Sequence, residues 1–287
     1  MVPTRFAPSA EGGGMENLMN KKMPIGVMDA GMGGLTVVKE LQKLLPGEDI
    51  VFYGEGKYQP YGNRSEDVIL HLAKQNIEFL KRQGVKTVAI GCNTISTLID
   101  KYQDDFDFKI FSIVQAGSDM VLDMGIEKVG VLATMFTIES GCYTRLIHAQ
   151  NPKVSVIGQG SVYLARILED GDFNRERIDN ELKFCLDQML QKEPELQTMV
   201  LGCTHFPMAS ENILRLYPQL TTLINPAEAQ AKQVAEYLRA ENALNDQKKG
   251  TFKLYSTTNC ETYLSAARRI GCNEPDVVEL APAPVMR

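Results

Sequence analysis

Short apolar runs alternate with amphipathic stretches along most of this chain. The runs are rich in β-branched residues and have the length of strands that are buried on both faces. They predict strands at residues 24–28, 49–54, 109–114, 129–133, 154–158, 248–256 and 277–280. The amphipathic stretches predict helices at residues 35–45, 65–83, 95–102, 140–150, 162–169, 175–191, 227–239 and 260–270. Strands that alternate with helices are typical of βαβ units, so the pattern predicts an α/β fold with mainly parallel sheets.

Two ten-residue stretches of the chain are near copies of each other. Residues 85–94 have the sequence VKTVAIGCNT, and residues 196–205 have the sequence LQTMVLGCTH. Each predicts a buried strand, a turn at Gly and a Cys directly after it, Cys92 in the first stretch and Cys203 in the second. Ligands of open α/β sheets bind at the carboxyl ends of the strands. Both thiols are therefore placed where a site can form.

The order of the predicted elements restarts midway along the chain. Residues 129–133 (VGVLA) echo residues 25–29 (IGVMD), and strand–loop–helix units again lead up to a Gly-Cys pair. This indicates an internal duplication, with a period longer than that of solenoid repeats. We therefore predict two pseudo-symmetric, doubly wound α/β domains with the active site between them.

The domain boundaries follow from this restart. The first predicted domain combines residues 23–116 with residues 226–287, so that the end of the chain returns to complete the first sheet. The second predicted domain spans residues 117–225. Residues 1–22 are rich in Gly, Pro and Ser and lack periodicity, so we expect a disordered leader without a function.

The bulk composition excludes several classes of function. With 287 residues, of which 44% are hydrophobic and 23% charged, the chain has the composition of an ordinary globular protein. A net charge of −6 without a Lys/Arg block argues against nucleic acid or an anionic membrane as partner. No apolar run reaches the roughly 20 residues that span a bilayer. The six cysteines form no CxxC pair and there are only three histidines, so we expect no metal, no disulfides and a cytoplasmic location.

A Gly-rich turn follows the first predicted strand. Asp29-Ala-Gly-Met-Gly-Gly34 leads into an amphipathic helix, and such a turn can bind an anion on free backbone N–H groups. It is neither a GxGxxG nor a Walker loop, which leaves a nucleotide site as a lesser alternative. Asp29 is interpreted as a polar group that points into the site, with a helix N-cap as the alternative. Further along, Pro60-Tyr-Gly62 either closes over a ligand or forms a plain surface turn.

Two thiols at equivalent positions of two facing halves suit one reaction in particular. One thiol can take a proton from a carbon atom while the other returns a proton to the opposite face. Asp29 is the candidate proton partner of Cys92, and His205 is that of Cys203. No metal or pyridoxal-phosphate signature accompanies them, so we expect the protein alone to labilise the α-proton. Hydroxyl and amide groups are expected to hold the carboxylate and the developing enolate charge: Asn93, Thr94 and Thr204.

Two other interpretations stay open from the residue pattern. In the first, Cys203 is a nucleophile with His205 as its base, as in amidases, which leaves the repeated Cys92 unexplained. In the second, the repeat is structural and both thiols are packing residues under a turn. The other four cysteines are expected to be packing residues: Cys142, Cys185, Cys260 and Cys272.

At these residues the chain resembles the glutamate racemase family of cofactor-independent amino-acid racemases. The resemblance covers residues 23–282, and its motifs fall in the family's order. These motifs are Asp29-Ala-Gly-Met-Gly-Gly-Leu-Thr-Val37, Pro60-Tyr-Gly62, Cys92-Asn-Thr94, Ala133-Thr-Met-Phe-Thr137 and Gly202-Cys-Thr-His-Phe-Pro207. The paired Cys motifs together with Pro-Tyr-Gly are highly specific, whereas the Gly turn alone is a weak signal.

The resemblance implies two α/β domains that enclose L- or D-glutamate without a cofactor or a metal. It implies that Cys92 acts on the D-enantiomer and Cys203 on the L-enantiomer, assisted by Asp29 and His205 respectively. D-Glutamate feeds peptidoglycan synthesis, which implies a bacterial cytoplasmic enzyme, commonly a homodimer. The implied substrate contacts are Asp29, Ala30, Pro60, Tyr61, Gly62, Asn93, Thr94, Thr134, Thr137, Thr204 and His205.

Four departures from the family pattern bear on the substrate. Ala30 stands where members usually have Ser, so a substrate-contacting hydroxyl is missing, and Glu55 stands where Asp is usual. Gln115-Ala116 replaces Glu-Pro, and Ser161-Val162 replaces Cys-Pro. None of them touches the proton-transfer pair. The loss of a hydrogen bond that nothing replaces costs about 1–3 kcal/mol, which is enough to change the preferred substrate. Racemisation of another acidic or small amino acid is therefore the alternative to racemisation of glutamate.

Overall fold

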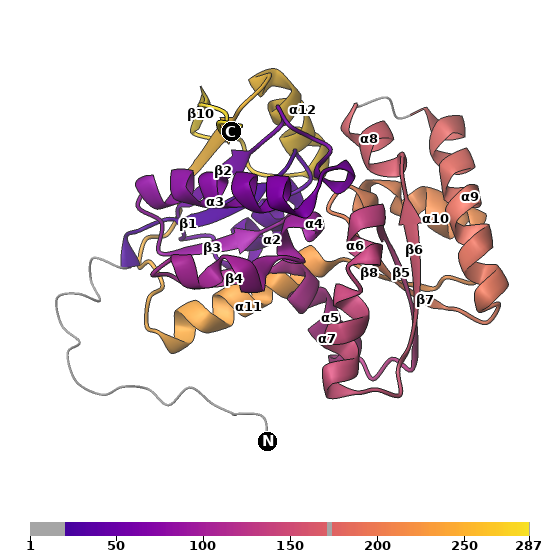
Figure 1. Ribbon diagram of the computed structural model, residues 1–287. Coiled ribbons are helices and arrows are strands. Elements are labelled where there is room, and N and C mark those ends of the chain that lie inside the picture. Colours follow the sequence, from indigo (N-terminus) through magenta and orange to yellow (C-terminus); the bar gives the residue numbers. More distant parts are fainter. Residues whose placement is uncertain (1–20, 171–173, 287) are drawn as a thin grey trace.

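Two parallel sheets, each covered by helices on both faces, organise the protein (Figure 1). The computed structural model describes residues 21–170 and 174–286. The leader predicted at residues 1–22 therefore lies outside the described residues for all but its last two positions. Across the described part of the chain, no helix combines the length and the apolar character needed to cross a bilayer.

The first sheet has six strands within the described residues, in the order β10-β9-β2-β1-β3-β4. All neighbours run parallel. The strands are β1 (Ile25–Asp29), β2 (Ile50–Gly54), β3 (Thr87–Ile90), β4 (Ile110–Ser112), β9 (Phe252–Ser256) and β10 (Val277–Leu280). The end of the chain thus returns to the first sheet as predicted, because β9 pairs with β2.

The second sheet is smaller, with the order β6-β5-β7-β8 among the strands that the structure describes. These strands also run parallel, and they are β5 (Lys128–Thr134), β6 (Ser155–Ser161), β7 (Thr198–Gly202) and β8 (Thr222–Ile224). This order repeats the order β2-β1-β3-β4 of the first sheet. The repeat predicted from the sequence therefore appears as a repeat of topology, with β1 equivalent to β5 and β3 equivalent to β7.

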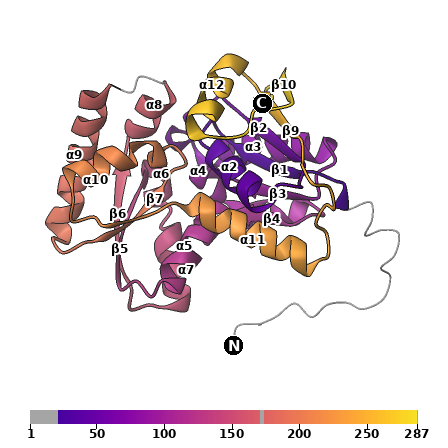
Figure 2. The same ribbon diagram turned by 180° about the vertical axis from the view of Figure 1, so that it is seen from behind.

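Helices cover both faces of each sheet (Figure 2). In the first sheet, α3 and α4 pack on one face and α2, α11 and α12 on the other; in the second, α8, α9 and α10 pack opposite α7. The α-helices are α2 (Leu35–Leu44), α3 (Glu66–Arg82), α4 (Asn93–Ser96), α5 (Ile113–Asp123), α6 (Met135–Glu139), α7 (Cys142–Gln150), α8 (Leu164–Glu169), α9 (Arg175–Lys192), α10 (Ser210–Leu216), α11 (Pro226–Ala240) and α12 (Cys260–Ile270). Short 3₁₀ helices are η1 (Tyr61–Asn63), η2 (Ile99–Lys101), η3 (Gln103–Asp105) and η4 (Phe206–Ala209).

One apolar core runs continuously from the first sheet to the second. It includes Ile25 and Val27 of β1, Val129 and Val131 of β5, and buried residues of α2, α5, α7 and α11 between them. Each outer face has a separate core, one under α3 and one under α8, α9 and α10. Apolar side chains from both halves are buried against each other in this shared layer. Because separating the halves would expose them to water, the layer holds the two sheets in a fixed relative position.

The strand predicted at residues 109–114 ends earlier than expected. β4 stops at Ser112, whose hydroxyl accepts a hydrogen bond from the backbone N–H of Gln115, 3.2 Å away, and so caps α5. Ser112 and Gln115 have the S-x-x-Q spacing of a capping box, a sequence signal that would have located this helix. Helix α5 spans the boundary predicted between residues 116 and 117, and that boundary stays a prediction.

The helix predicted at residues 95–102 is wrong as a single element. A short helix, α4, ends at Ser96 and is followed by the 3₁₀ turns η2 and η3. The hydroxyls of Ser96 and Thr97 donate to backbone carbonyls, of Ile90 and Thr94 respectively. Such local side-chain bonds compete with helix propagation.

Candidate active site

The carboxyl ends of the central strands of both sheets meet at one cavity. β1 and β3 are neighbours in the first sheet and β5 and β7 in the second, and each pair lies where the strand order reverses. The cavity has a volume of about 270 Å³. It is lined by Asp29, Ala30, Gly56, Gln59, Pro60, Tyr61, Gly62, Cys92, Asn93, Thr94, Thr134, Ala165, Arg166, Glu169, Asp170, Cys203, Thr204 and His205. Every predicted site residue except Thr137 is in this lining.

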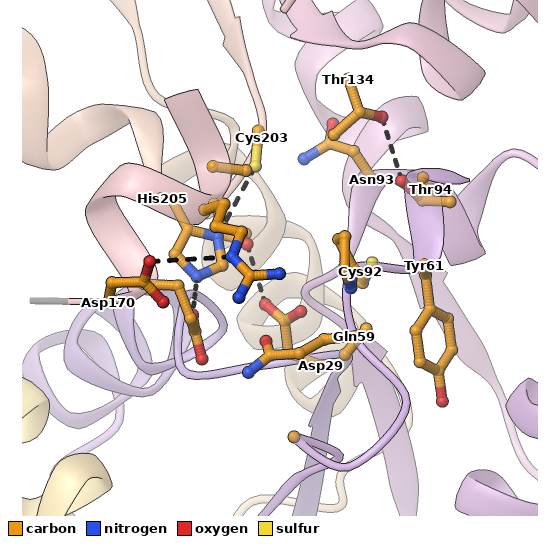
Figure 3. A pocket seen from close by; sticks show the side chains of 18 residues that line it. Asp29, Gln59, Tyr61, Cys92, Asn93, Thr94, Thr134, Asp170, Cys203 and His205 are labelled. Atoms are coloured by element: carbon orange, nitrogen blue, oxygen red, sulfur yellow. Dashed lines mark hydrogen bonds and ion pairs between the residues drawn. The ribbon is translucent and has the colours of Figure 1, made fainter. Parts of the chain in front are cut away.

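The two predicted thiols face this cavity from different sheets. Cys92 follows β3 and is 8% exposed, and Cys203 follows β7 and is 7% exposed. Figure 3 shows Cys203 with His205 on one side of the opening and Cys92 with Tyr61 on the other. The structure thus brings together the pair of thiols that the repeated stretches predicted.

Asp29 is the last residue of β1 and lies close to both Cys92 and Thr204. The residue is 2% exposed, and this burial raises the pKa of its carboxyl to about 6 despite the opposing influence of His205. Its Oδ2 accepts a hydrogen bond of 2.8 Å from the Thr204 hydroxyl. Burial, and then the charge of Asp29, raise the pKa of the Cys92 thiol well above its usual value. The N-cap of α2 is Gly34, so the structure does not support the interpretation of Asp29 as that N-cap.

On the other side, His205 links Cys203 to a carboxylate. Its Nδ1 lies 3.6 Å from the Cys203 sulfur, and its Nε2 forms a short ion pair with Oε2 of Glu169. Burial lowers the pKa of His205, but Glu169 and Cys203 raise it by more, so the net pKa lies well above its usual value. Burial raises the pKa of Glu169, but the charge of His205 and the hydrogen bonds to the carboxylate together lower it by more, so the net pKa lies below its usual value. The imidazolium therefore stabilises negative charge on the Cys203 sulfur.

Glu169 is the main site residue that the sequence analysis missed. It was predicted only as the last residue of a helix. A carboxylate at the carboxyl end of a helix is unfavourable next to the helix dipole, so an acidic residue there indicates a partner elsewhere. In the structure that partner is His205, and Oε2 of Glu169 also accepts a hydrogen bond of 3.4 Å from the backbone N–H of Met32.

The Gly-rich turn after β1 permits the two halves to approach each other. A Cβ atom on Gly33 would lie 2.4 Å from the Thr204 hydroxyl and 2.9 Å from Nδ1 of His205. A Cβ atom on Gly34 would lie 2.7 Å from that of Asp29. These distances are too short for any side chain, so the glycines serve close packing around Asp29 and His205 rather than a nucleotide site.

Hydroxyl and amide groups form the rim opposite His205. The hydroxyls of Thr94 and Thr134 lie 3.1 Å apart, and the Tyr143 hydroxyl donates to Oδ1 of Asn93 over 2.8 Å. Nδ2 of Asn93 is buried and has no hydrogen-bond partner among the described residues. A buried N–H donor without a partner is unfavourable, and a bound carboxylate would satisfy it. Thr137 lies behind this rim, with its hydroxyl 3.0 Å from that of Thr134.

The loop that carries Pro60, Tyr61 and Gly62 closes the cavity on a third side. Glu55 anchors this loop: its carboxylate accepts hydrogen bonds from the backbone N–H of Lys57 at 2.8 Å and from the Thr257 hydroxyl at 3.0 Å. Glu55 is fully buried. The departure from Asp at this position therefore lies in the support of the loop, outside the lining of the cavity.

The described residues contain no cluster of three or more His, Cys, Asp or Glu side chains arranged to hold a metal ion.

Comparison with known proteins identifies the family. Residues 56–234 match the model of the Asp/Glu/hydantoin racemase family. The chain belongs to this family. Glutamate racemase 1 of Caldanaerobacter subterraneus subsp. tengcongensis is 35% identical over 250 residues, which cover 87% of this chain and 92% of that protein. The resemblance to glutamate racemases noted from the motifs is thereby confirmed.

Solved structures of this racemase family agree with the observed fold. Glutamate racemase from Francisella tularensis in complex with D-glutamate superposes with a TM-score of 0.84 at 31% identity, covering 92% of this chain and 98% of that chain. Glutamate racemase from Thermus thermophilus in complex with β-chloro-D-alanine gives a TM-score of 0.80 at 30% identity, with coverages of 91% and 98%. The predicted fold class, two doubly wound domains with parallel sheets, is therefore confirmed.

The departures from the family pattern lie at different distances from the cavity. Ala30 is part of the lining, so its missing hydroxyl bears directly on a ligand. Gln115 instead donates to Asp119 on α5, and Ser161 donates to Glu181 on α9. Neither of these two side chains lines the cavity that holds the thiols.

Proposed function

We propose that this protein interconverts L- and D-glutamate without a cofactor, using Cys92 and Cys203 as the two acid–base groups. The observation that carries the proposal is the presence of both thiols, from equivalent strands of two repeated halves, in the lining of one cavity. Each thiol also has its own proton partner. Glutamate racemases with 35% identity and a relative solved with D-glutamate support glutamate as the substrate.

The reaction needs one thiolate and one thiol at its start. With D-glutamate, the Cys92 thiolate takes the α-proton and becomes a thiol, and the electron pair of the broken C–H bond is delocalised into the carboxylate as an enolate. The Cys203 thiol then gives its proton to the opposite face of the carbon, which leaves L-glutamate and a Cys203 thiolate. With L-glutamate, the same steps run in reverse. Hydrogen bonds to the enolate lower the barrier where the charge develops.

The proton partners restore the starting state after each turnover. The His205 imidazolium can return a proton to Cys203, and Glu169 keeps the imidazole charged. Asp29, with a pKa of about 6, can accept a proton from the Cys92 side and release it near neutral pH.

The substrate carboxylate is assigned to the rim opposite His205. Nδ2 of Asn93 is the buried donor that lacks a partner, and the Thr94 and Thr134 hydroxyls lie beside it. Thr204 completes the set from the second half of the site. By these contacts the α-carbon is held between the two sulfurs, which is the geometry that proton transfer on both faces requires.

The first experiment incubates the wild-type protein with L-glutamate in D₂O. We expect D-glutamate by chiral chromatography, deuterium at the α-carbon and no release of ammonia. Cys92→Ala is expected to abolish racemisation of both enantiomers. Ammonia release or a trapped thioester that depends on Cys203 alone would support the amidase alternative instead, and racemisation by Cys92→Ala at the wild-type rate would overturn the two-base mechanism.

The role of the product follows from the same proposal. D-Glutamate made by such an enzyme would supply peptidoglycan synthesis in the bacterial cytoplasm. A homodimer, as implied by the family resemblance, stays a prediction that the molar mass in solution can test.

A further inference from the structure

Helix α8 presents a charged face to the cavity. Arg166 and Glu169 are three positions apart on one side of the helix, Asp170 follows directly after its last residue, and all three line the cavity. Leu164 and Leu168 are buried in the core of the second half, which fixes the direction of the charged face. The helix and its C-cap residue therefore add one cation and two anions to the site.

Arg166 is the one Lys or Arg side chain among the described residues of the lining. The lining also holds three carboxyl groups, those of Asp29, Glu169 and Asp170. His205, the other cation, is already engaged by Glu169 and Cys203. A substrate with a second carboxylate would meet repulsion in such a cavity unless a cation offset it, and Arg166 is the group left for that purpose.

The present contact of Arg166 is weak enough to be exchanged. Its closest approach to Asp170 is 3.7 Å, between Nε and Oδ2, which is longer than a hydrogen bond. The two side chains are 67% and 48% exposed, so solvent screens their attraction. A guanidinium group can bind a carboxylate through two parallel N–H donors, a geometry that the contact with Asp170 does not use.

We propose that Arg166 pairs with the side-chain carboxylate of the substrate and determines the preference for a dicarboxylic amino acid. This inference rests on the proposed racemase function and names a residue that the motifs did not indicate. Figure 3 shows Asp170, the partner of Arg166, on the His205 side, whereas Asn93 and Thr94 lie on the other side of the opening. The two ends of a dicarboxylate can thus be bound at separate places.

The test compares two ligands of the same size, L-glutamate with a charged side chain and L-glutamine with a neutral one. For wild type, Arg166→Ala and Arg166→Lys, the Michaelis constant for L-glutamate and the inhibition constant of L-glutamine are measured. We expect Arg166→Ala to raise the Michaelis constant for L-glutamate about 10-fold, with kcat and the inhibition constant of L-glutamine unchanged. Arg166→Lys is expected to restore part of the loss, because it keeps the charge without the planar fork.

Two further variants serve as controls. Arg175→Ala removes an arginine with the same i,i+4 spacing to an aspartate, Asp179, and a similar exposure of 69%, but outside the cavity lining. It is expected to leave both constants unchanged. Asp170→Asn removes the competing carboxylate and is expected to lower the Michaelis constant for L-glutamate about 2- to 3-fold.

The outcomes separate this inference from the proposed function. If wild type racemises L-glutamate but Arg166→Ala changes the constants for glutamate and glutamine equally, or changes neither, the inference is overturned while the function stands. If wild type does not racemise glutamate, the function itself fails. Attraction by a single charge also predicts that added salt weakens glutamate binding in wild type more than in Arg166→Ala, and equal salt effects would contradict the inference.

Discussion

Cys92 and Cys203 follow equivalent strands of the two halves, yet their proton partners carry opposite charges. Cys92 lies near the buried carboxyl of Asp29, which opposes a thiolate, whereas Cys203 lies 3.6 Å from a histidine that Glu169 keeps protonated. The repeated strands thus place two identical thiols at equivalent positions. The residues around them give the two sulfur atoms different electrostatic environments, next to a carboxyl group at Cys92 and next to an imidazolium at Cys203.

The largest expected effect comes from weakening each thiol in turn. Cys92→Ser and Cys203→Ser should each lower kcat about 10²- to 10⁴-fold, because a hydroxyl is far less acidic than a thiol and forms almost no anionic base near neutral pH. In D₂O, Cys92→Ser should still exchange the α-proton of L-glutamate faster than that of D-glutamate, and Cys203→Ser the reverse. The measurement is deuterium incorporation by NMR. Equal losses of exchange for both enantiomers in both variants would contradict separate roles for the two thiols.

The positive charge of His205 can be reduced without substituting either cysteine. Glu169→Gln should lower the pKa of His205, since Glu169 raises it, so the imidazolium would lose its proton at a lower pH. The basic limb of the pH profile with L-glutamate should then shift to lower pH, and kcat should fall about 10- to 100-fold near neutral pH. The profile with wild type is the reference. An unchanged profile would show that Glu169 does not control the charge of His205.

The ionised carboxyl of Asp29, which the proposed reaction needs, is predicted to lower the stability of the folded protein. Its folded-state pKa of about 6 lies above the ordinary value of 3.8. Protonated Asp29 therefore stabilises the fold at low pH, and this stabilisation is lost as the pH rises from about 4 to about 6, which costs about 1–3 kcal/mol above pH 6. Asp29→Asn should be more stable than wild type at pH 8, by less at pH 5, and nearly inactive.

Urea unfolding at both pH values measures this difference. Asp107→Asn is the control, because that carboxyl is exposed and its pKa is lowered by its own backbone N–H and by Lys81. It should show no stabilisation at pH 8. A stability gain of Asp29→Asn that is the same at both pH values would point to packing rather than to the buried charge.

The smallest expected effects distinguish the two threonines of the predicted set. Thr134 lines the cavity and Thr137 lies behind it, with their hydroxyls 3.0 Å apart. Thr134→Val should raise the Michaelis constant for glutamate about 3- to 10-fold by removing a donor to the substrate. Thr137→Val should alter it by less than about 2-fold, since it acts only through Thr134. Steady-state kinetics checks both, and a larger effect at Thr137 would reverse the assignment.

Residues at the ends of single strands could be placed in the fold from the sequence. The strand ends of β1, β3 and β7 are short, buried and followed by distinctive residues, so Asp29, Cys92 and Cys203 could be placed at the carboxyl edge of each sheet without a structure. Parallel pairing within each sheet then brings them together. For Pro60-Tyr-Gly62 the residue pattern left a loop over a ligand and a plain surface turn equally open, and the family resemblance favoured the loop and added Thr134.

Residues that act through long-range pairing were not predictable in this way. Glu169 gains its role only because α8 packs against the loop that carries His205, and Arg166 gains its place by the same packing. Neither residue lies in a strand-end motif. Helix α5 was missed because its start at Ile113 continues the apolar run of β4, and only the capping hydroxyl of Ser112 separates the two.

The apolar layer between the sheets has a consequence for how the molecule could be divided. Its members come from β1 and α2 of one half, β5 and α7 of the other, and from α5 and α11 between them. Either half produced alone would expose this layer to water and would aggregate or recruit a second chain. A protein made of a single half would need to cover the same layer by self-association.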